Sequence, residues 1–455
     1  VRNLAIYPCL SNWEKRVLPL SNPLLRRDAC KVGLRRTFRQ KSPTWEERLA
    51  DAVTPLWRLN YEEQLQLKVE RQQEILRELS SRLSNTDSVP LLPIIPSPLR
   101  NGYRNKSTFS VNKGVDGNPK TVGFYIGTGK SGNVVCVGGG HLLNMPEKHA
   151  LVARCYEDFI RQSPLRPCIV FSDGGHWREV TVRTTSAGGA MAIVYFHPQD
   201  LTREQKSQHK AKLVEYFARG PGSVCRLDSL YLQESAMTRC SHQDSPYQLL
   251  YGQPHIHEEL LGFRFRISAD AFFQVNTAAA AVLYRTVGEL TRVSGGETLL
   301  DVCCGTGAIG ISLSSKVKRV IGIEVMEQAV EDARHNAETN GVRNCEFLSG
   351  KAEAVLPKLM PSLDSDSGLT AVVNPSRAGL HYRIIRALRN HLSIRRLVYI
   401  SCKPDGEAMR NFVELCCSRN EQKKLTGEPF TLTLAVPVDM FPHTTHCELL
   451  LVFER

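Results

Sequence analysis

The segment LLDVCCGTGAIG, residues 299–310, constrains the fold of this chain more than any other feature. An apolar run that reads as a buried strand leads into Gly305, Gly307 and Gly310, and the helix-like stretch AIGISLSS follows. Glycine lets the backbone turn sharply and approach a bound molecule closely. The segment therefore predicts a strand, a ligand-binding turn and a helix in succession, as in a Rossmann-like fold.

Apolar strands and helical stretches alternate from about residue 261 onward. Strands are expected at RVIGIEV (319–325), LTAVVNP (369–375) and RRLVYISC (395–402), with the helical stretch EQAVEDARHNAETNG after the first of them. This alternation predicts an α/β domain with a mainly parallel sheet. Two final strands, FTLTLAVPVDM and HCELLLVFER, predict an antiparallel, hairpin-like pair.

Two acidic residues decide which molecule the glycine-rich turn would hold. The turn alone would also suit NAD. Asp301 lies four residues before Gly305, a spacing more typical of S-adenosylmethionine sites, where an acid can meet the cationic amino-acid end. Glu324 ends the next strand, where a carboxylate can accept hydrogen bonds from both ribose hydroxyls. Together the two acids favour the methyl donor over a dinucleotide.

The motif that begins at Asn374 bears on the methyl acceptor. It follows a strand that should lie centrally in the sheet, so its tip is expected to face the cofactor crevice. Methyltransferases that act on amino groups carry N-P-P-[YF], whereas this chain has N-P-S-R and lacks the aromatic residue. An amino-group target is therefore not expected.

Cys402 stands at the end of a predicted strand, where a nucleophile would sit. Most cysteines in such a chain are small, inert hydrophobic residues, but methylation at carbon 5 of a pyrimidine would require a thiolate. The thiolate adds to carbon 6 and makes carbon 5 nucleophilic, and a base must then remove the carbon-5 proton. Glu448 enters an apolar strand, where a carboxylate is costly to bury, and is the candidate base.

The length of the chain predicts more than one domain. Residues 1–44 form a basic extension, and 45–95 combine a helical segment with a proline-rich linker. Residues 96–260 predict a smaller β-rich α+β domain, and 261–455 the Rossmann-like domain.

The charge of the chain indicates an anionic partner. The formal net charge is +12, which favours nucleic acid. Basic and aromatic residues are interleaved in the first half of the β-rich domain, and this mixture suits RNA. Phe109 and Phe124 are nevertheless expected in the core of that domain rather than on an RNA surface.

The 14 cysteines are scattered and form no C-x-x-C pair. A zinc site or an iron–sulfur cluster is therefore not expected. No apolar run reaches the ~18 residues that a membrane helix needs. We expect free thiols in a reducing compartment, no metal and no membrane partner.

Residues 1–41 contain ten Lys or Arg and only two acids, Glu14 and Asp28. The chain begins at Val1 rather than Met, so it reads as a processed form or a fragment. The abundance of Ser, Leu and Arg resembles an organelle-targeting presequence and predicts a mitochondrial (matrix) location. The alternative is a disordered basic arm that contacts nucleic acid.

Six motifs resemble those of the RNA uracil-5-methyltransferases, which modify tRNA and rRNA and include the tRNA (uracil-5-)-methyltransferases. The β-rich segment from GYRNKSTFS to HLLNMPEKH also resembles that family's central domain, and the basic N-terminus resembles that of a mitochondrial animal member. The motifs are FFQVN (272–276), DVCCGTGAIG (301–310), IGIEV (321–325), NPSRAGL (374–380), YISCKP (399–404) and DMFPHTTHCE (439–448).

The resemblance implies a Rossmann-like, S-adenosylmethionine-dependent methyltransferase domain at the C-terminus that makes 5-methyluridine in RNA. The T-loop uridine of tRNA is the first expected substrate and rRNA the second. By resemblance, the nucleophile is Cys402, the base is Glu448, the S-adenosylmethionine contacts are Gln274, Glu324 and Asn374, and the turn from Gly305 to Gly307 lies beside the donor's amino-acid end.

One departure supports an alternative function. The family usually has D-P-P-R where this chain has Asn374-Pro375-Ser376-Arg377, so the carbonyl acceptor is kept and the charge is lost. The alternative is an RNA-binding or RNA-folding protein with a decayed catalytic site. The presence of both Cys402 and Glu448 opposes it, and a methyltransferase acting on another atom would have no use for Cys402.

Overall fold

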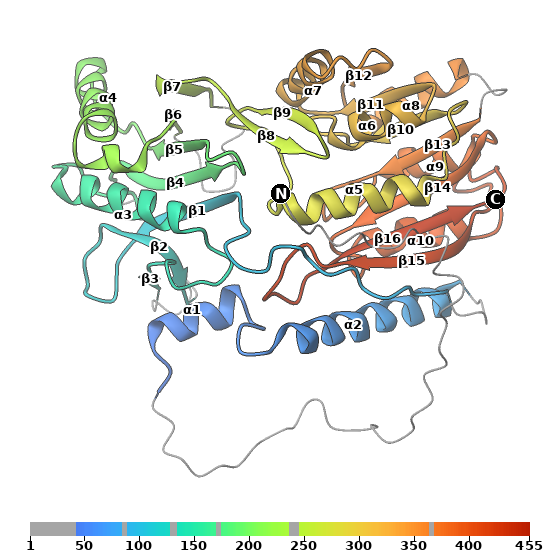
Figure 1. Ribbon diagram of the computed structural model, residues 1–455, viewed down its shortest axis with the longest axis horizontal. Coiled ribbons are helices and arrows are strands. Elements are labelled where there is room, and N and C mark those ends of the chain that lie inside the picture. Colours follow the sequence, from blue (N-terminus) through green and yellow to red (C-terminus); the bar gives the residue numbers. More distant parts are fainter. Residues whose placement is uncertain (1–41, 84–88, 128–133, 170–173, 236–244, 364–367) are drawn as a thin grey trace, which may run out of the picture. The chain divides into compact units, whose positions relative to one another are not determined.

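Two seven-stranded sheets carry most of the fold (Figure 1). The contacts within the computed structural model separate residues 1–44 from residues 45–455. The predicted targeting segment, residues 1–41, lies outside the described residues, so its prediction stays untested. The structure describes residues 42–83, 89–127, 134–169, 174–235, 245–363 and 368–455.

The C-terminal sheet has the strand order β12-β11-β10-β13-β14-β16-β15. Neighbouring strands from β12 to β14 are parallel, whereas β16 runs antiparallel to both β14 and β15. The predicted α/β fold and its antiparallel end are therefore confirmed. The strands are β10 (Thr298–Val302), β11 (Arg319–Glu324), β12 (Cys345–Ser349), β13 (Leu369–Val373), β14 (Ile394–Ser401), β15 (Thr431–Val438) and β16 (Glu448–Glu454).

Helices cover both faces of this sheet, which explains why its central strands are almost continuously apolar. One face packs against α8, α9 and α10 in a core that includes Val302, Val373 and Tyr399. Of the other helices in this domain, α5 contacts β13 and β14, and α6 and α7 contact β11. The helices are α5 (Thr277–Thr291), α6 (Ala308–Leu313), α7 (Glu327–Thr339), α8 (Ala352–Leu359), α9 (Tyr382–Asn390) and α10 (Ala408–Cys416), with the short 3-10 helices η6 (Ser314–Lys316) and η7 (Met360–Ser362).

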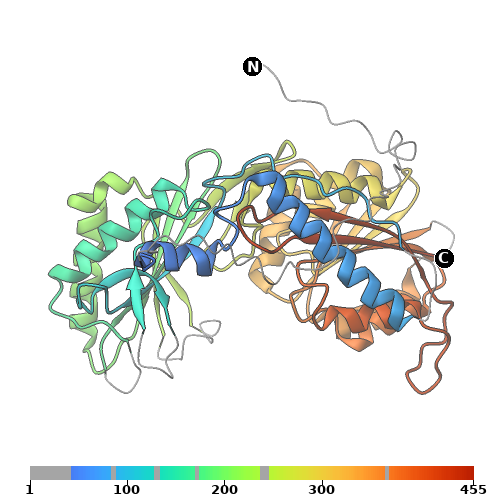
Figure 2. The ribbon, with the colours of Figure 1, turned by 90° about the horizontal axis from the view of Figure 1, so that it is seen from below.

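The predicted helical segment at 45–84 forms two helices, α1 (Trp45–Val53) and α2 (Tyr61–Arg82). Asn60 ends the intervening turn and starts α2 through a capping box with Glu63. The C-terminal half of α2 packs against the core of the C-terminal sheet. In Figure 2, α2 crosses in front of the β15–β16 hairpin.

The buried face of α2 is partly polar. Leu67, one of several leucines among the charged residues of this helix, is 44% exposed. Polar Gln64 and Lys68 are buried instead, each 1% exposed. Those polar side chains contact a loop of the C-terminal domain rather than the apolar core.

The proline-rich linker runs beside β15 in an extended conformation. Leu92 N–H donates to the Ala435 carbonyl at 2.9 Å, and Ile95 N–H donates to Pro437 at the same distance. The Ala435 N–H donates in return to Pro90. Prolines have no N–H to donate, so the segment pairs only through the residues between them.

The central sheet has the order β3-β2-β1-β4-β5-β6-β7 and is antiparallel except between β5 and β6. Phe109 is buried and its ring lies 5.2 Å from that of Phe124, so the expectation of a core position for Phe109 is met. The elements are β1 (Lys106–Asn112), β2 (Thr121–Ile126), β3 (Val135–Val137), α3 (Glu147–Gln162), β4 (Trp177–Thr184), β5 (Ala190–Phe196), α4 (Arg203–Ala218), η4 (Pro221–Cys225), β6 (Ser229–Glu234) and β7 (Tyr247–Gly252).

A two-stranded ribbon, β8 (Ile256–Leu260) and β9 (Phe263–Ile267), follows the central sheet in sequence. Arg266 in β9 pairs with Asp332 of α7 at 2.8 Å, so the ribbon is bound to the C-terminal domain. Among the helices that the structure describes, none has the length and apolar character needed to cross a bilayer.

Candidate active site

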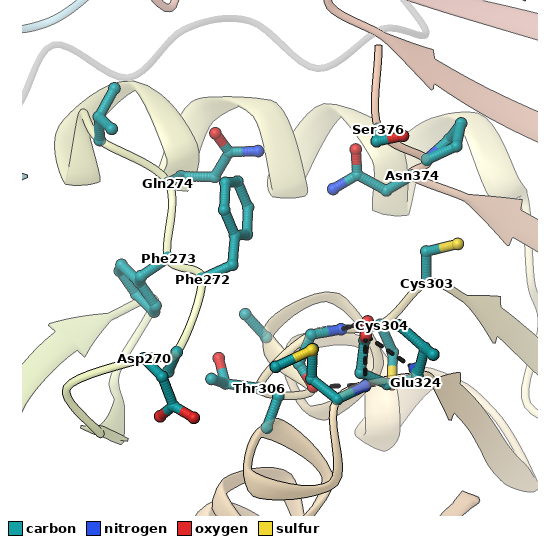
Figure 3. Close-up of a pocket in the computed structure, with 18 of the residues that line it drawn as sticks. Asp270, Phe272, Phe273, Gln274, Cys303, Cys304, Thr306, Glu324, Asn374 and Ser376 are labelled. Atoms are coloured by element: carbon teal, nitrogen blue, oxygen red, sulfur yellow. Dashed lines mark hydrogen bonds between the residues drawn. The ribbon is translucent and has the colours of Figure 1, made fainter. Parts of the chain in front are cut away.

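A cavity of about 1500 Å³ opens at the carboxyl ends of β10, β11, β13 and β14. Such ends are where open α/β sheets bind ligands. Figure 3 shows the loop with Asp270, Phe272 and Gln274 facing the strand ends that carry Cys304, Glu324 and Asn374. Of the residues singled out from the sequence, the cavity is lined by Gln274, Gly305, Glu324, Asn374, Cys402 and Glu448.

The glycine-rich turn after β10 depends on glycine at two positions. Gly305 and Gly307 have φ values of +55° and +78°, which side chains rarely adopt. A Cβ on Gly307 would also lie 2.9 Å from the Phe347 ring, whereas one on Gly305 would meet no atom within 4 Å. Gly307 therefore allows close packing at the start of α6, and Gly305 faces open space.

Glu324 ties the turn to the end of β11. Its Oε2 accepts the Gly305 N–H at 3.0 Å, and its Oε1 accepts the N–H groups of Val325 and Met326 at 2.8 and 3.0 Å. A carboxylate offers about four acceptor positions, so about one remains for a ligand hydroxyl. The carboxylate thus shapes the turn as well as facing the cavity.

Asp301 does not reach the cavity. Its side chain is fully buried, and Oδ2 accepts the Gly310 N–H at 3.0 Å. Burial raises the pKa of this carboxyl to about 7. The sequence prediction placed Asp301 against the amino-acid end of the donor, but its side chain lies beneath the turn and fastens α6 to β10.

Gln274 and Asn374 line the cavity from opposite sides (Figure 3). The Gln274 carbonyl accepts from the Asn105 amide at 2.7 Å, which links this loop to the start of the central sheet. The Gln274 side chain is also hydrogen-bonded to the buried Tyr284 of α5. Asn374 donates its backbone N–H to Val302 at 3.1 Å, which leaves its side chain at the cavity wall.

Cys402 and Glu448 meet at the ends of two adjacent strands. In the antiparallel pairing of β14 and β16, Ser401 lies opposite Leu449. Cys402 follows the last residue of β14, and Glu448 is the first residue of β16, so the two face each other where the strand pairing ends. Residues 46 positions apart in sequence are thereby neighbours in the cavity.

The electrostatic surroundings of this pair are distinctive. Burial raises the pKa of Glu448 to about 8, and nearby Arg377 opposes that rise. Burial also raises the pKa of the Cys402 thiol, and Glu448 adds to the rise. Arg377 donates a hydrogen bond to Cys402 and lowers its pKa in part. A cation is thus placed to favour the ionised form of either group.

Two groups of lining residues can be distinguished. The cofactor wall consists of Gly305, Thr306 and Glu324, and it offers backbone N–H groups and a carboxylate. The catalytic wall consists of Arg377, Cys402 and Glu448, and it offers a cation, a thiol and a carboxyl group. These residues fit S-adenosylmethionine and a flat acceptor side by side, because one wall suits ribose and amino-acid groups and the other suits an electrophilic ring.

The fold and the cavity define the class of Rossmann-like S-adenosylmethionine-dependent methyltransferases. The family profile described as tRNA (Uracil-5-)-methyltransferase matches residues 247–455. The chain is 66% identical to the tRNA (uracil-5-)-methyltransferase homolog B of Danio rerio, over 96% of this chain and 94% of the relative. It is 56% identical to homolog B of Homo sapiens, over 98% and 95%. The chain belongs to the tRNA (uracil-5-)-methyltransferase family.

A solved structure agrees with this assignment. The tRNA (uracil-54, C5)-methyltransferase of Pyrococcus abyssi, in complex with S-adenosyl-L-homocysteine, is 25% identical and has a TM-score of 0.61. The match covers 88% of this chain and 84% of that one. The predicted methyltransferase activity, its fold and its donor, S-adenosylmethionine, are therefore confirmed.

Two residues of the site were not predicted from the sequence. Arg377 belongs to one of the motifs, but its contact with Cys402 and its influence on the pKa of Glu448 were not foreseen. Tyr284 lies outside the motifs and is hydrogen-bonded to Gln274. Spacing could not reveal either contact, because each depends on how separate elements pack.

Proposed function

We propose that this chain methylates carbon 5 of a uridine in tRNA through a covalent bond between Cys402 and the base. The observation that carries the proposal is the meeting of Cys402 and Glu448 beside Arg377 in a cavity that also contains the cofactor wall. A T-loop uridine is the first substrate to test, and an rRNA uridine is the second.

The residues of the catalytic wall would act in a fixed order. The Cys402 thiolate adds to carbon 6, and the electrons of the C5–C6 double bond make carbon 5 nucleophilic. Carbon 5 would take the electrophilic methyl group that bound S-adenosylmethionine supplies, and the electrons of the methyl–sulfur bond would remain on the donor sulfur. Glu448 then takes the carbon-5 proton, and the electrons of that C–H bond re-form the double bond and expel the thiolate. Both groups end ready for the next cycle once Glu448 releases its proton.

The protonation states of Cys402 and Glu448 before the reaction determine whether these steps can occur. With its pKa raised to about 8, Glu448 is mostly protonated at neutral pH. The Cys402 pKa is raised as well. Arg377 favours the charged form of both groups, so we assign it the role of holding the site near its reactive state.

The target uridine must leave its stack to reach this cavity. Basic side chains lie near the cavity on the central domain. Arg104 lines it, and burial together with Arg183 and Arg104 lowers the pKa of Lys106 to about 8. Contacts with RNA phosphates from such groups would make binding weaken as salt rises.

We also propose a mitochondrial location. It is supported only by the composition of residues 1–41. A fusion of these residues to a fluorescent protein should accumulate in mitochondria of animal cells. Diffuse or nuclear fluorescence would contradict this location without affecting the proposed chemistry.

The covalent step can be tested with RNA that contains 5-fluorouridine. Fluorine cannot be removed as a proton, so the enzyme should stall as a protein–RNA adduct that survives a denaturing gel. The wild-type chain with S-adenosylmethionine should give a slow band, and Cys402→Ala should give none. Cys447→Ala, at another free thiol, is the matched control and should retain the band. RNA binding without any adduct would contradict the covalent mechanism.

A further inference from the structure

Helix α2 buries polar side chains on one face. Tyr61, Gln64, Lys68 and Gln72 are spaced three or four residues apart, and all are buried. This spacing places them on a single stripe of the helix. Burial of polar groups is costly unless they are hydrogen-bonded. The hydrogen-bond partners of these side chains therefore indicate the role of the stripe.

The centre of the stripe is an ion pair between Lys68 and Asp439. Lys68 Nζ lies 2.6 Å from Asp439 Oδ1, and the two side chains are 1% and 0% exposed. Lys68 Nζ also donates to the Phe441 carbonyl at 3.0 Å. Tyr61 Oη donates to Asp439 Oδ2 at 2.8 Å. Both oxygens of Asp439 are thus held by α2.

Helix α2 and the turn before it also bind His443, in the loop that begins at Asp439. Gln64 Oε1 accepts the His443 N–H at 2.7 Å, and the His443 carbonyl accepts the Leu56 N–H at 3.0 Å. His443 has a φ of +67°, a conformation that costs energy for a residue with a side chain. The loop from Asp439 to His443 therefore keeps its shape through contacts with residues 56–68, and it leads directly to Glu448.

A further contact connects α2 with the other catalytic loop. Arg71 Nη2 lies 2.7 Å from Asp405 Oδ2, three residues after Cys402. A second cavity, of about 510 Å³, lies between the helix and the two loops and is lined by Lys68, Arg71 and Cys402. One helix thus touches the segment before the base and the segment after the nucleophile.

The physical character of the ion pair points to geometry rather than to stability. A buried pair gains little over an apolar pair of the same size, because both ions lose their hydration. The ion pair does fix the distance and orientation between α2 and the loop that begins at Asp439. Catalytic groups displaced by about 1 Å can lose roughly 100-fold in rate, so a fixed loop before Glu448 has a direct kinetic value.

We propose that Lys68 is a positioning residue for the proton-removal step: through Asp439 it sets where Glu448 stands relative to carbon 5 of the bound uracil. This proposal rests on the proposed function. Cys402 addition and methyl transfer precede proton removal, so loss of Lys68 should slow release of the covalent adduct more than its formation.

The test compares two rates in the full chain. Formation of the adduct with 5-fluorouridine tRNA reports the steps up to methyl transfer, and turnover on unmodified tRNA reports all steps. In Lys68→Met, turnover should fall by roughly tenfold or more, while adduct formation should stay within about threefold. An adduct with ordinary tRNA should also accumulate on a denaturing gel.

Two further variants separate positioning from folding. Lys206→Met removes a lysine of helix α4 that pairs with Glu234 at the end of β6, and both rates should match wild type. Tyr61→Phe removes one hydrogen bond to Asp439 and keeps the ion pair, so it should shift the ratio of the two rates in the same direction by a smaller factor. Melting temperature and binding of S-adenosylhomocysteine report whether each variant is folded.

The outcomes are distinct. If both rates fall by the same factor in the folded Lys68→Met and Tyr61→Phe variants, or if neither falls, Lys68 has no positioning role and the proposal is overturned. If the wild-type chain forms no adduct and transfers no methyl group to tRNA, the proposed function itself fails, and that result is visible before any variant is measured.

Discussion

The two walls of the cavity are built in different ways. The cofactor wall comes from one continuous stretch of chain, in which the Glu324 carboxylate binds the N–H groups of Gly305, Val325 and Met326. The catalytic wall gathers Arg377, Cys402 and Glu448 from three strand ends. Contacts from α2 hold two of the loops beside it.

This difference teaches where each wall is vulnerable. The cofactor wall is specified by residues close in sequence. Substitutions in it should weaken donor binding, and a higher donor concentration should restore the rate. The catalytic wall is specified by the strand order and by a distant helix. Substitutions in this wall should slow the chemical steps, and the loss of rate should remain at any donor concentration.

The largest expected effect belongs to Glu448→Gln. Glutamine keeps the size of the side chain but cannot accept the carbon-5 proton, so turnover should fall by on the order of 10³-fold. The adduct with ordinary uridine tRNA should accumulate, and donor affinity should be unchanged. Glu454→Gln, at the other end of β16, is the matched control and should turn over normally. A Glu448→Gln enzyme that turns over at more than a tenth of the wild-type rate would remove Glu448 as the base.

A smaller loss is expected for Arg377→Met. The variant removes the cation that donates a hydrogen bond to Cys402 and lowers its pKa. Adduct formation with 5-fluorouridine RNA should slow by about 10- to 100-fold, since a hydrogen bond to a charged group contributes ~1.5–3 kcal/mol. The loss should be partly recovered at higher pH, where more thiolate is present. Arg383→Met, at an exposed position of α9, should have no such effect, and a loss that is independent of pH would contradict this role.

Glu324→Gln probes the cofactor wall. An amide is a weaker acceptor and brings its own N–H₂ group toward the Gly305 N–H, so the turn should loosen. Donor binding, measured by calorimetry with S-adenosylhomocysteine, should weaken by roughly tenfold. At saturating donor, adduct formation should return to the wild-type rate, unlike that of Arg377→Met. Glu327→Gln, in the first turn of α7, serves as control. A rate defect that saturating donor cannot restore would break the distinction between the walls.

The last expected effect is on stability rather than on rate. Burial raises the pKa of Glu448 from 4.5 to about 8, so between these values the folded chain binds a proton that the unfolded chain has lost. The free energy of unfolding should therefore fall with rising pH, by up to ~1.4 kcal/mol per pH unit from this group. Glu448→Gln removes this term, and its melting temperature should exceed that of wild type increasingly as pH rises through this window. Melting temperatures of the two chains that differ by the same amount across this range would show that folding does not raise the pKa of Glu448.

The sequence was sufficient to predict the fold and several of the residues that line the cavity. Strand ends gather at one edge of a parallel sheet, so the turn at Gly305, the acid at Glu324 and the thiol at Cys402 could be placed together from the sequence alone. The predicted position of the Asp301 side chain in the cavity was wrong. Its position at a strand end was correct, but its side chain points beneath the turn, and spacing alone does not say on which side a side chain lies.

The contribution of α2 was beyond reach for a different reason. Periodicity weighs apolar residues, and the stripe that matters on this helix contains Gln64 and Lys68. A polar stripe reads as a solvated face unless its partner is known, and the partner, Asp439, lies 371 residues away. Arg377 was likewise visible in the sequence, but its position beside Cys402 and Glu448 was not.

The proline-rich segment beside β15 has a consequence for association between chains. β15 is the last strand of its sheet, and an uncovered last strand offers its N–H and C=O groups to any other extended chain. Residues 90–95 take up several of these groups, and Pro90 and Pro93 have no N–H of their own to offer to a further chain. The segment therefore ends the sheet in a form that a second molecule cannot readily extend, which protects the enzyme from edge-to-edge aggregation.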